Sequence, residues 1–394
     1  MTHHSVAKIF FAWTAFFVFA GLLVFPLSAD AIEGKCEIWP AWKNFRHNFV
    51  SDSGRVIDRS TPVIDRSTPQ DITTSEGQAY ALMFALIAND RASFELILRW
   101  TEDNLAGGDL TGQLPAWQWG RRGDDSWGVI DSSAASDADL WITYALNEAG
   151  RLWKIPKYTA LAELLAARIL REETAEIPGL GLTLLPGPKG FHPDEATWRL
   201  NPSYLPMQIM RRFAAIYPKS VWNKLAASSL EIIIHSAPLG FVPEWVNYQA
   251  GKGFQIDSST IATGSFNAIR VYLWAGMLDR RDPAYSQLLK KLAPMGRHVS
   301  DNGVPPREID ISTGASNGSG TVGFSAALLP FLKASKMASA LRQQIQRVLA
   351  LYPFGRTDNY YDQVLALFGQ GWIEERYKFD RNGLLKPRWI CIGN

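Results

Sequence analysis

The sequence predicts an all-α protein of the (α/α)6 toroid class, a barrel of six helical hairpins with minor short strands in the loops. Apolar residues recur at the i, i+3, i+4 spacing of amphipathic helices, as in Leu161, Leu164, Leu165 and Ile169. Short polar breaks divide the helical pattern into twelve segments, which suits six consecutive pairs. Alternation typical of strands is scarce, and only residues 182–185 and 254–256 are candidates.

The predicted helices follow one another from residue 39 onward. They span residues 39–49, 76–89, 91–104, 134–149, 156–172, 202–216, 220–235, 258–278, 283–298, 323–332, 337–350 and 359–368. Thr73, Thr74 and Ser75 are good capping residues that lead directly into the second segment. No low-complexity segment or linker divides the chain, so we predict a single domain over residues 32–394.

The first 31 residues have the pattern of a secretory signal. Lys8 precedes an apolar run over residues 9–25, and Ala29, Asp30 and Ala31 form an A-x-A cleavage site. The run is short for a membrane span, so cleavage near Ala31 is favoured over an uncleaved anchor. We therefore expect a periplasmic or secreted protein with no stable membrane insertion after cleavage.

Charge and cysteine content restrict the partners and the compartment. The net charge of +2 gives no electrostatic basis for binding nucleic acid or an anionic membrane. Cys36 and Cys391 stand at opposite ends of the mature chain. In an oxidising compartment they could pair across a long loop, which we favour slightly over two free thiols.

A seven-residue unit occurs twice, at residues 56–62 and 63–69. Two short copies that each end in Ser-Thr-Pro indicate a duplicated loop and not a solenoid. Such a duplication costs little loop-closure entropy. It precedes Glu76 closely enough to alter one rim of a cleft.

Fifteen tryptophans are many for a chain in which charged residues make up 20%. Trp117 and Trp119 stand in the Gly/Pro-punctuated stretch 115–120. Exposed rings of this kind stack against the C–H faces of sugars in a binding cleft. Burial as a loop anchor is nearly as good an interpretation for any single tryptophan.

Several ordered motifs resemble glycoside hydrolase family 8, and within it the periplasmic endoglucanases associated with bacterial cellulose synthesis. The resemblance covers nearly the whole mature chain. The motifs are SEGQ at 75–78, ASDADLWI at 135–142 and GSFNAIR at 264–270, with WPAW at 39–42, NPSYLP at 201–206 and FGQGW at 368–372. The resemblance implies the same (α/α)6 fold and an inverting mechanism, in which a carboxylic acid protonates the leaving oxygen and a base activates water.

Glu76 matches the general acid of the family. By itself, an acidic residue in the first turn of a helix only complements the helix dipole. An acid at neutral pH also needs a raised pKa, which burial or a nearby negative charge must supply. Asp137 is the natural source of that charge, because it matches the first aspartate of the family signature. Without the resemblance, Asp137 would be a helix cap, and Asp139, two residues later, cannot share its helical face.

Asn267 departs from the family pattern. In the closest relatives this position is the aspartate that acts as general base, and an asparagine cannot take a proton from water. Another carboxylate could serve instead, with Asp137 favoured over Asp257 and Glu244. Alternatively, the protein retains glucan binding with impaired hydrolysis, or the asparagine is an engineered substitution.

Two further residues match family positions. Arg270, one turn after Asn267, matches an active-site arginine, although an ordinary helix ion pair would explain it equally well. Tyr204 matches a tyrosine that helps to hold the attacking water, although core packing would also explain it. We place Trp117, Trp119, Tyr204 and Arg270 among the substrate-binding residues, and Glu76, Asp137 and Asn267 among the catalytic ones.

Other chemistries fit poorly. The six histidines show no His-x-x-x-His pair for zinc, the glycines lack a phosphate-loop context, and no Gly-x-Ser-x-Gly elbow is present. An acid/base mechanism requires no metal or organic cofactor.

The leading hypothesis is an exported endo-β-1,4-glucanase that trims nascent cellulose and takes β-glucan as its partner, with the cellulose synthase complex as a possible second partner. A glucan-binding accessory protein is the alternative, and a toroid enzyme acting on chitosan, mixed-linkage glucan or xylan is a weaker third.

Overall fold

The computed structural model describes Met1 and residues 39–59, 71–257, 262–350 and 359–389. Its contacts divide the chain into two units, Met1–Lys35 and Cys36–Asn394, and every described helix and strand belongs to the second. The predicted signal segment, both cysteines and most of the duplicated loop lie outside the described residues. The boundary of the predicted domain therefore stays a prediction.

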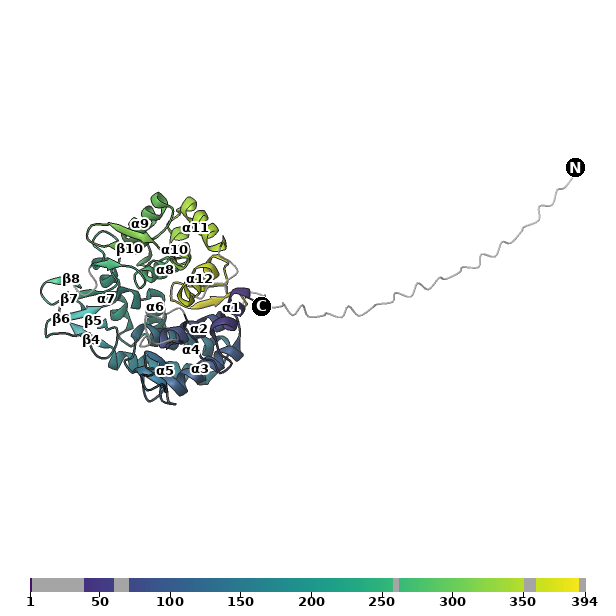
Figure 1. Ribbon diagram of the computed structural model, residues 1–394. Coiled ribbons are helices and arrows are strands. Elements are labelled where there is room, and N and C mark those ends of the chain that lie inside the picture. Colours follow the sequence, from purple (N-terminus) through teal and green to yellow (C-terminus); the bar gives the residue numbers. More distant parts are fainter. Residues whose placement is uncertain (2–38, 60–70, 258–261, 351–358, 390–394) are drawn as a thin grey trace. The chain divides into compact units, whose positions relative to one another are not determined.

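Twelve α-helices and one short 3-10 helix are described in the second unit (Figure 1). The α-helices are α1 Pro40–Phe49, α2 Ser75–Ile87, α3 Arg91–Leu105, α4 Ser136–Leu152, α5 Pro156–Glu172, α6 Met207–Ile216, α7 Trp222–His235, α8 Ile269–Gly276, α9 Tyr285–Asn302, α10 Val322–Ala334, α11 Ala338–Ala350 and α12 Tyr360–Ile373. The 3-10 helix η1 spans Pro202–Tyr204. None of the described helices is long and apolar enough to cross a membrane.

The helices form the predicted (α/α)6 barrel. Six inner helices pack in the order α2, α4, α6, α8, α10 and α12, and each has one outer partner: α3, α5, α7, α9, α11 and α1 respectively. The ring closes where Phe368 of α12 meets Phe84 and Tyr80 of α2, with ring centroids 4.6 and 5.1 Å apart. The fold class predicted from the sequence is confirmed.

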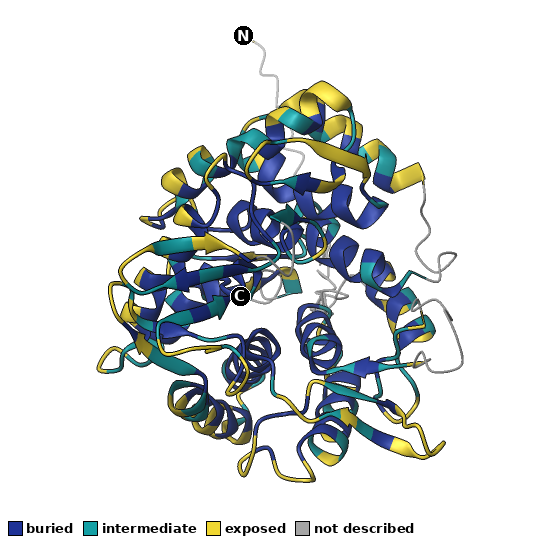
Figure 2. Cartoon of the chain, turned by 60° about the vertical axis from the view of Figure 1, so that its left-hand side comes forward, coloured by how far each residue is buried: buried dark blue, intermediate teal, exposed yellow. Residues whose placement is uncertain are grey.

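Burial separates the two rings of helices. Helices α2, α4, α8, α10 and α12 are buried on nearly all sides, whereas α3, α5 and α11 bury only one stripe. Figure 2 shows the central helices in dark blue throughout and the peripheral ones with yellow outer faces. A helix that is apolar all round must lie inside the protein, and this requirement assigns the inner ring.

In the described part of the chain, thirteen short strands form five small sheets, more than the two strands predicted. They are β1 Thr73–Thr74, β2 Gln118–Arg121, β3 Trp127–Asp131, β4 Thr174–Ile177, β5 Gly181–Leu184, β6 Thr197–Leu200, β7 Val246–Gln249, β8 Gly253–Ile256, β9 Thr263–Gly264, β10 Pro306–Asp310, β11 Ser316–Ser319, β12 Tyr377–Phe379 and β13 Leu385–Pro387. Most have two to four residues, which is too short for alternation to be visible in the sequence. The two predicted strands correspond to parts of β5 and β8.

Two predicted helices include long non-helical stretches, and those predicted at residues 283–298 and 359–368 continue to Asn302 and Ile373. Residues 202–216 divide into η1 and α6, because the Asn201 side chain caps a single 3-10 turn before Pro206 starts the next helix. The helix predicted at residues 258–278 begins only at Ile269. Ahead of it, Gly264 lies in β9, where a Cβ atom would stand 2.1 Å from the Val242 carbonyl oxygen. Of that predicted helix, residues 258–261 lie outside the described residues.

Candidate active site

Glu76 is the second residue of the inner helix α2. The Thr74 side chain accepts a hydrogen bond from the Gly77 N–H at 3.1 Å, so the predicted cap is present and Glu76 lies in the first turn. Its carboxylate Oε1 accepts a hydrogen bond from the Tyr80 hydroxyl at 2.8 Å and pairs with Arg270. The side chain keeps 25% of its surface exposed, so a ligand can reach it.

Asp137 lies in the first turn of the neighbouring inner helix α4 and is 3% exposed. Its Oδ1 accepts the Ala138 N–H at 2.8 Å, and its Oδ2 lies 3.3 Å from Nη1 of Arg270. Burial raises the pKa of Asp137 to about 7. The structure therefore brings Asp137 to Glu76, as predicted, with a carboxyl group that changes charge near neutral pH.

Arg270 connects the elements that surround the site. Arg270 lies in the first turn of α8 and is 3% exposed. Its Nη1 contacts Glu76, Asp137 and the Tyr80 hydroxyl. Its Nη2 donates to Ser203 Oγ at 3.0 Å and to Asn267 Oδ1 at 2.7 Å. Burial lowers the pKa of Arg270, but two carboxyl groups in contact with it stabilise the cation.

Asn267 is held between a cation and an anion. Its Oδ1 accepts from Arg270, and its Nδ2 donates to Glu244 Oε2 at 2.8 Å. These contacts fix which end of the amide faces which partner. The Glu244 carboxylate also accepts the backbone N–H groups of Ser265, Asn267 and Ala268 at 2.7, 2.9 and 3.0 Å. It therefore closes the turn that leads into α8.

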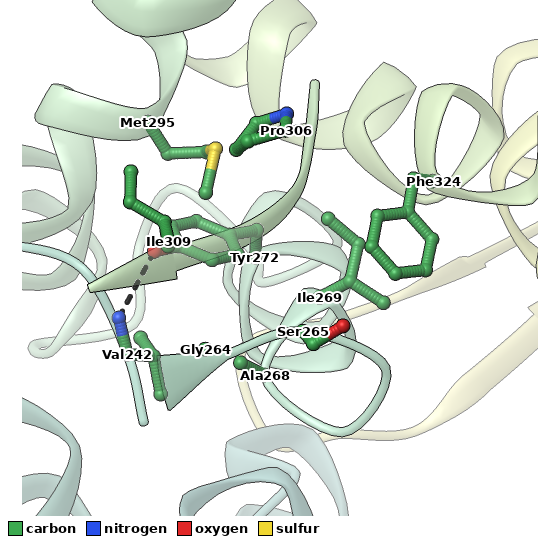
Figure 3. Close-up of a pocket in the computed structure, with 10 residues that line it drawn as sticks. All are labelled: Val242, Gly264, Ser265, Ala268, Ile269, Tyr272, Met295, Pro306, Ile309 and Phe324. Carbon is green, nitrogen blue, oxygen red and sulfur yellow. Dashed lines mark hydrogen bonds between the residues drawn. The ribbon is translucent and has the colours of Figure 1, made fainter. Parts of the chain in front are cut away.

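A small apolar cavity lies against this turn. It measures about 10 Å³ and is lined by Val242, Gly264, Ser265, Ala268, Ile269, Tyr272, Met295, Pro306, Ile309 and Phe324. The Tyr272 hydroxyl accepts the Val242 N–H across one end of it at 3.1 Å (Figure 3). A packed apolar floor of this kind gives the turn little freedom to shift.

The three carboxylates considered as substitutes for the base occupy different surroundings. Asp137 Oδ2 is 3.3 Å from the nitrogen that also contacts Glu76. Asp137 and Glu76 therefore share one cation, and Asp137 is 3% exposed. Asp257 is 4% exposed and pairs with Arg199 at 2.7 Å, whereas Glu244 touches Asn267 itself.

The predicted tryptophans have different environments. Trp117 is 39% exposed, and its carbonyl oxygen accepts the Ser75 N–H at 2.9 Å, which places it beside the start of α2. The ring of Trp119 stacks on Trp127 and meets the edge of Trp100, with centroids 5.4 and 5.3 Å away. The guanidinium of Arg55 lies 4.4 Å from the Trp119 ring. The ring of Trp119 thus packs against Trp127, which is 48% exposed. Trp127 was not among the substrate-binding residues predicted from the sequence.

Tyr204 lies at the end of η1, opposite Arg270. The guanidinium stands 5.9 Å from its ring centroid, and Trp245 packs on the other side at 6.1 Å. Burial raises the pKa of the Tyr204 hydroxyl well above its usual value, so it remains a hydrogen-bond donor at neutral pH.

Tyr80 and Ser203 are functional neighbours that the sequence reasoning missed. The Tyr80 hydroxyl donates to Glu76 one helical turn earlier, and Ser203 Oγ accepts from Arg270. The i, i+4 spacing of Glu76 and Tyr80 was the available signal. Among the described residues, no group of three or more His, Cys, Asp or Glu side chains could hold a metal ion.

Two carboxyl groups and an arginine thus meet at the starts of three inner helices of the barrel, as in a class of glycoside hydrolases. The chain belongs to glycosyl hydrolases family 8, whose model matches residues 17–375. An endoglucanase of Escherichia coli O157:H7 is 44% identical over 363 residues, which cover 92% of this chain and 94% of that protein.

Two further similar proteins are also glucanases. An endoglucanase of Xanthomonas axonopodis pv. citri is 44% identical over 365 residues, covering 92% of this chain and 93% of its own length. The crystal structure of an endo-1,4-D-glucanase from Vibrio fischeri ES114 is 43% identical and superposes with a TM-score of 0.81, covering 89% of this chain and 99% of that one. The protein is therefore an inverting glycoside hydrolase.

Proposed function

We propose that Glu76 is the general acid of this enzyme, an endo-β-1,4-glucanase that hydrolyses internal bonds of cellulose. The observation that carries the proposal is the meeting of Glu76, Asp137 and Arg270 at the starts of three inner helices. An exposed tryptophan, Trp117, is hydrogen-bonded to the same helix start. The backbone of Trp117 is thus joined to the helix start that carries Glu76, and its exposed ring suits a sugar face.

The arrangement around Glu76 determines where its proton sits. Oε1 takes the contacts from Tyr80 and Arg270, so Oε2 is the oxygen that carries the proton to the glycosidic oxygen. Asp137 competes for the same guanidinium nitrogen. When Asp137 is ionised, its carboxylate neutralises the positive charge of Arg270. Glu76 then keeps its proton more easily.

We propose Glu244 as the base that takes the proton of the attacking water, with Asn267 as the residue that orients it. Asp137 is buried against Arg270, and Asp257 is engaged by Arg199. Glu244 lies on the side of Asn267 opposite Arg270, and it is only partly buried. Tyr204 and Arg270 are the proposed substrate-binding groups on the same wall of the site.

A glucan-binding protein with impaired hydrolysis is the second candidate function. The observation that favours it is the number of hydrogen bonds that Glu244 already accepts, three from backbone N–H groups and one from Asn267. Hydrogen bonds to a carboxylate stabilise its charged form and weaken it as a base.

The first test is reducing-sugar release from carboxymethylcellulose by the native chain and five variants, one of which is Asn267→Asp alone. We expect Glu76→Gln and Glu244→Gln each to lose activity by about 10²–10⁴-fold, the usual contribution of an acid or a base. Asn267→Asp in the Glu244→Gln background should restore much of it. Glu308→Gln, an exposed acid on β10, should match the native chain.

The outcomes separate the two functions. Unchanged activity in Glu76→Gln would remove the acid assignment. Native activity that persists in Glu244→Gln would remove the base assignment. A native chain that binds carboxymethylcellulose but releases sugar only after Asn267→Asp would favour the binding protein.

The biological setting is also a proposal. Residues 1–31 suit export, and an endoglucanase in the periplasm of a cellulose-producing bacterium would trim nascent glucan, with the synthase complex as a partner. Fractionation of cells that express the full chain, or a chain without residues 2–31, tests the export; equal periplasmic amounts of both would contradict it.

A further inference from the structure

Three aromatic side chains form a stack on the sheet of β1, β2 and β3. Trp127 of β3 stacks on Trp119 of β2, with ring centroids 5.4 Å apart and planes inclined by 26°. Trp119 meets the edge of Trp100 of α3 at 5.3 Å, and Trp100 is buried. The stack therefore leads from a buried helix face to the surface, where Trp127 remains 48% exposed.

Arg55 holds the two outer rings of this stack in place. Its guanidinium lies 4.4 Å from the Trp119 centroid and 4.9 Å from the Trp127 centroid, which is within the range of a cation–π contact. Its Nε donates to Thr73 Oγ1 at 2.9 Å, and its Nη2 donates to the Asp71 carbonyl oxygen. Trp127 is thus an exposed ring in a fixed orientation, so a ligand that binds it has to order little of the protein.

The register of the sheet relates Trp127 to Glu76. Strand β1 leads directly into α2, which carries Glu76 in its first turn, and Trp119 lies opposite Thr73 of β1. Trp127 lies opposite Arg121, two residues beyond Trp119 on β2. Because β1 and β2 are antiparallel, moving along β2 toward Arg121 leads away from the start of α2. Trp127 therefore lies on the sheet that runs into α2, but farther along it from Glu76 than Trp119.

The groups around the Trp127 ring suit a sugar. Arg121 lies opposite Trp127 in the β2–β3 pair, and its guanidinium pairs with Asp125 at 3.1 Å; both charged side chains are exposed. The C–H face of a sugar can stack on the indole, and its hydroxyl groups can hydrogen-bond to charged groups at the edge of the ring. A neutral chain of sugar rings, such as the β-glucan that an endoglucanase cleaves, has both features.

We propose that Trp127 is a remote sugar-binding site, at which a β-glucan chain that extends from Glu76 places one of its sugar rings on the indole. Trp119 and Arg55 hold the indole in place. The inference rests on the proposed function of the site at Glu76, because the same chain has to reach both places. A long chain gains the contact with Trp127 and a short chain does not, so Trp127 makes the enzyme select for chain length.

Three variants test the role of this ring. Trp127→Ala removes the indole, whereas Trp127→Tyr keeps an aromatic face of smaller size. Leu164→Ala is the matched control, because Leu164 is an apolar side chain that is 52% exposed on the outer helix α5. Each change is made at an exposed side chain, so all three proteins should fold, and urea unfolding checks this.

The first measurement is the affinity for cellohexaose, determined by calorimetry in the Glu76→Gln background. It requires no hydrolysis, so it separates failure of this inference from failure of the proposed function. We expect Trp127→Ala to weaken binding by roughly three- to tenfold, the usual effect of an aromatic stacking contact. Trp127→Tyr should weaken binding less, and Leu164→Ala should keep the affinity of the background. Unweakened binding in Trp127→Ala, or an equal loss in Trp127→Tyr, would overturn the proposal.

The second measurement is the ratio of kcat/KM for cellohexaose to kcat/KM for cellotetraose, with Glu76 in place. Trp127→Ala should lower this ratio, because cellotetraose bound across Glu76 extends less far toward the ring. An equal fall for both sugars would overturn the proposal, since it would place Trp127 beside the cleavage point.

Sedimentation analysis tests a second copy of the chain as the other occupant of this surface. The proposal expects Trp127→Ala to leave the oligomeric state unchanged. A dimer that Trp127→Ala dissociates, together with unweakened binding of cellohexaose, would assign the ring to contact between copies and overturn the sugar-binding site.

Discussion

Single residues decide how charge is distributed in the active site. One guanidinium, Arg270, is in contact with Glu76 and Asp137 through the same nitrogen and with Asn267 through the other. One positive charge cannot neutralise two carboxylates, and burial raises the pKa of Asp137 to about 7.

At this scale we predict the effect of Asp137→Asn. Burial raises the pKa of Asp137 to about 7, and its charge helps Glu76 to keep the proton of the general acid. Removing the charge should lower activity at pH 7 by about tenfold or more and move the alkaline limb of kcat/KM to lower pH. The measurement is the pH profile between pH 5 and 9. A variant with the native alkaline limb would show that Asp137 does not act on Glu76.

The sequence indicated most of these residues but not their contacts. Glu76, Asp137, Asn267 and Arg270 each stand in a motif, and each has an ordinary alternative as a cap or an ion pair. Only the folded chain shows that Glu244, from the loop after α7, accepts a hydrogen bond from the Asn267 side chain. A contact between residues 23 positions apart in an irregular segment has no periodic signal in the sequence.

Between elements, the inner helices approach each other at glycines. Gly369 of α12 faces Ala326 of α10, and a Cβ atom on Gly369 would stand 1.8 Å from the Ala326 carbonyl oxygen. Both helices are buried on nearly all sides, so neither can retreat toward solvent. The adjacent Phe368 closes the barrel onto α2.

We therefore predict that Gly369→Ala destabilises the protein by about 1–3 kcal/mol, as overpacking of a core does. Urea unfolding followed by circular dichroism measures this change. Gly123→Ala is the control, because a Cβ atom on Gly123 meets nothing within 4 Å, and it should change stability by less than about 0.5 kcal/mol. Equal stability of the two variants would mean that α10 and α12 do not pack this closely.

Elements with strong periodicity were predicted well, and irregular ones were not. The helix predicted at residues 156–172 has the bounds of α5, because Pro156 starts it and its apolar stripe is continuous. The helix predicted at residues 258–278 was too long, because its apolar composition gave no sign of strand β9. This strand pairs with β10, where Gly264 lies opposite Ile309, 45 residues later in the chain. Strand pairing over such a distance is a tertiary property.

Across the whole folded unit, buried acids determine how stability depends on pH. The pKa of Asp137 is about 7 in the native state, above the ordinary value of 3.8, so the native state binds a proton that the unfolded chain has released. Stability from this group is fully present below about pH 4 and is lost as the pH rises through 7. Asp139 and Glu173 act in the same direction.

We predict that the free energy of unfolding is highest in mildly acidic solution and falls toward pH 8. The contribution of Asp137 is up to about 4 kcal/mol, from three pKa units at about 1.4 kcal/mol each, and Arg270 reduces it. Urea titrations at pH 5, 6, 7 and 8 measure the slope, which should be smaller in Asp137→Asn. Stability that rises over this interval would contradict the protonated state of these groups.

The sequence by itself determined the helical class, the six-hairpin order, the family resemblance and the identity of Glu76, Asp137, Asn267 and Arg270, because periodicity, caps and motifs are local. The tertiary structure decided which groups meet: Glu244 with Asn267, and two acids on one arginine. Electrostatic energies depend on distance and burial, and neither quantity exists until the chain is folded.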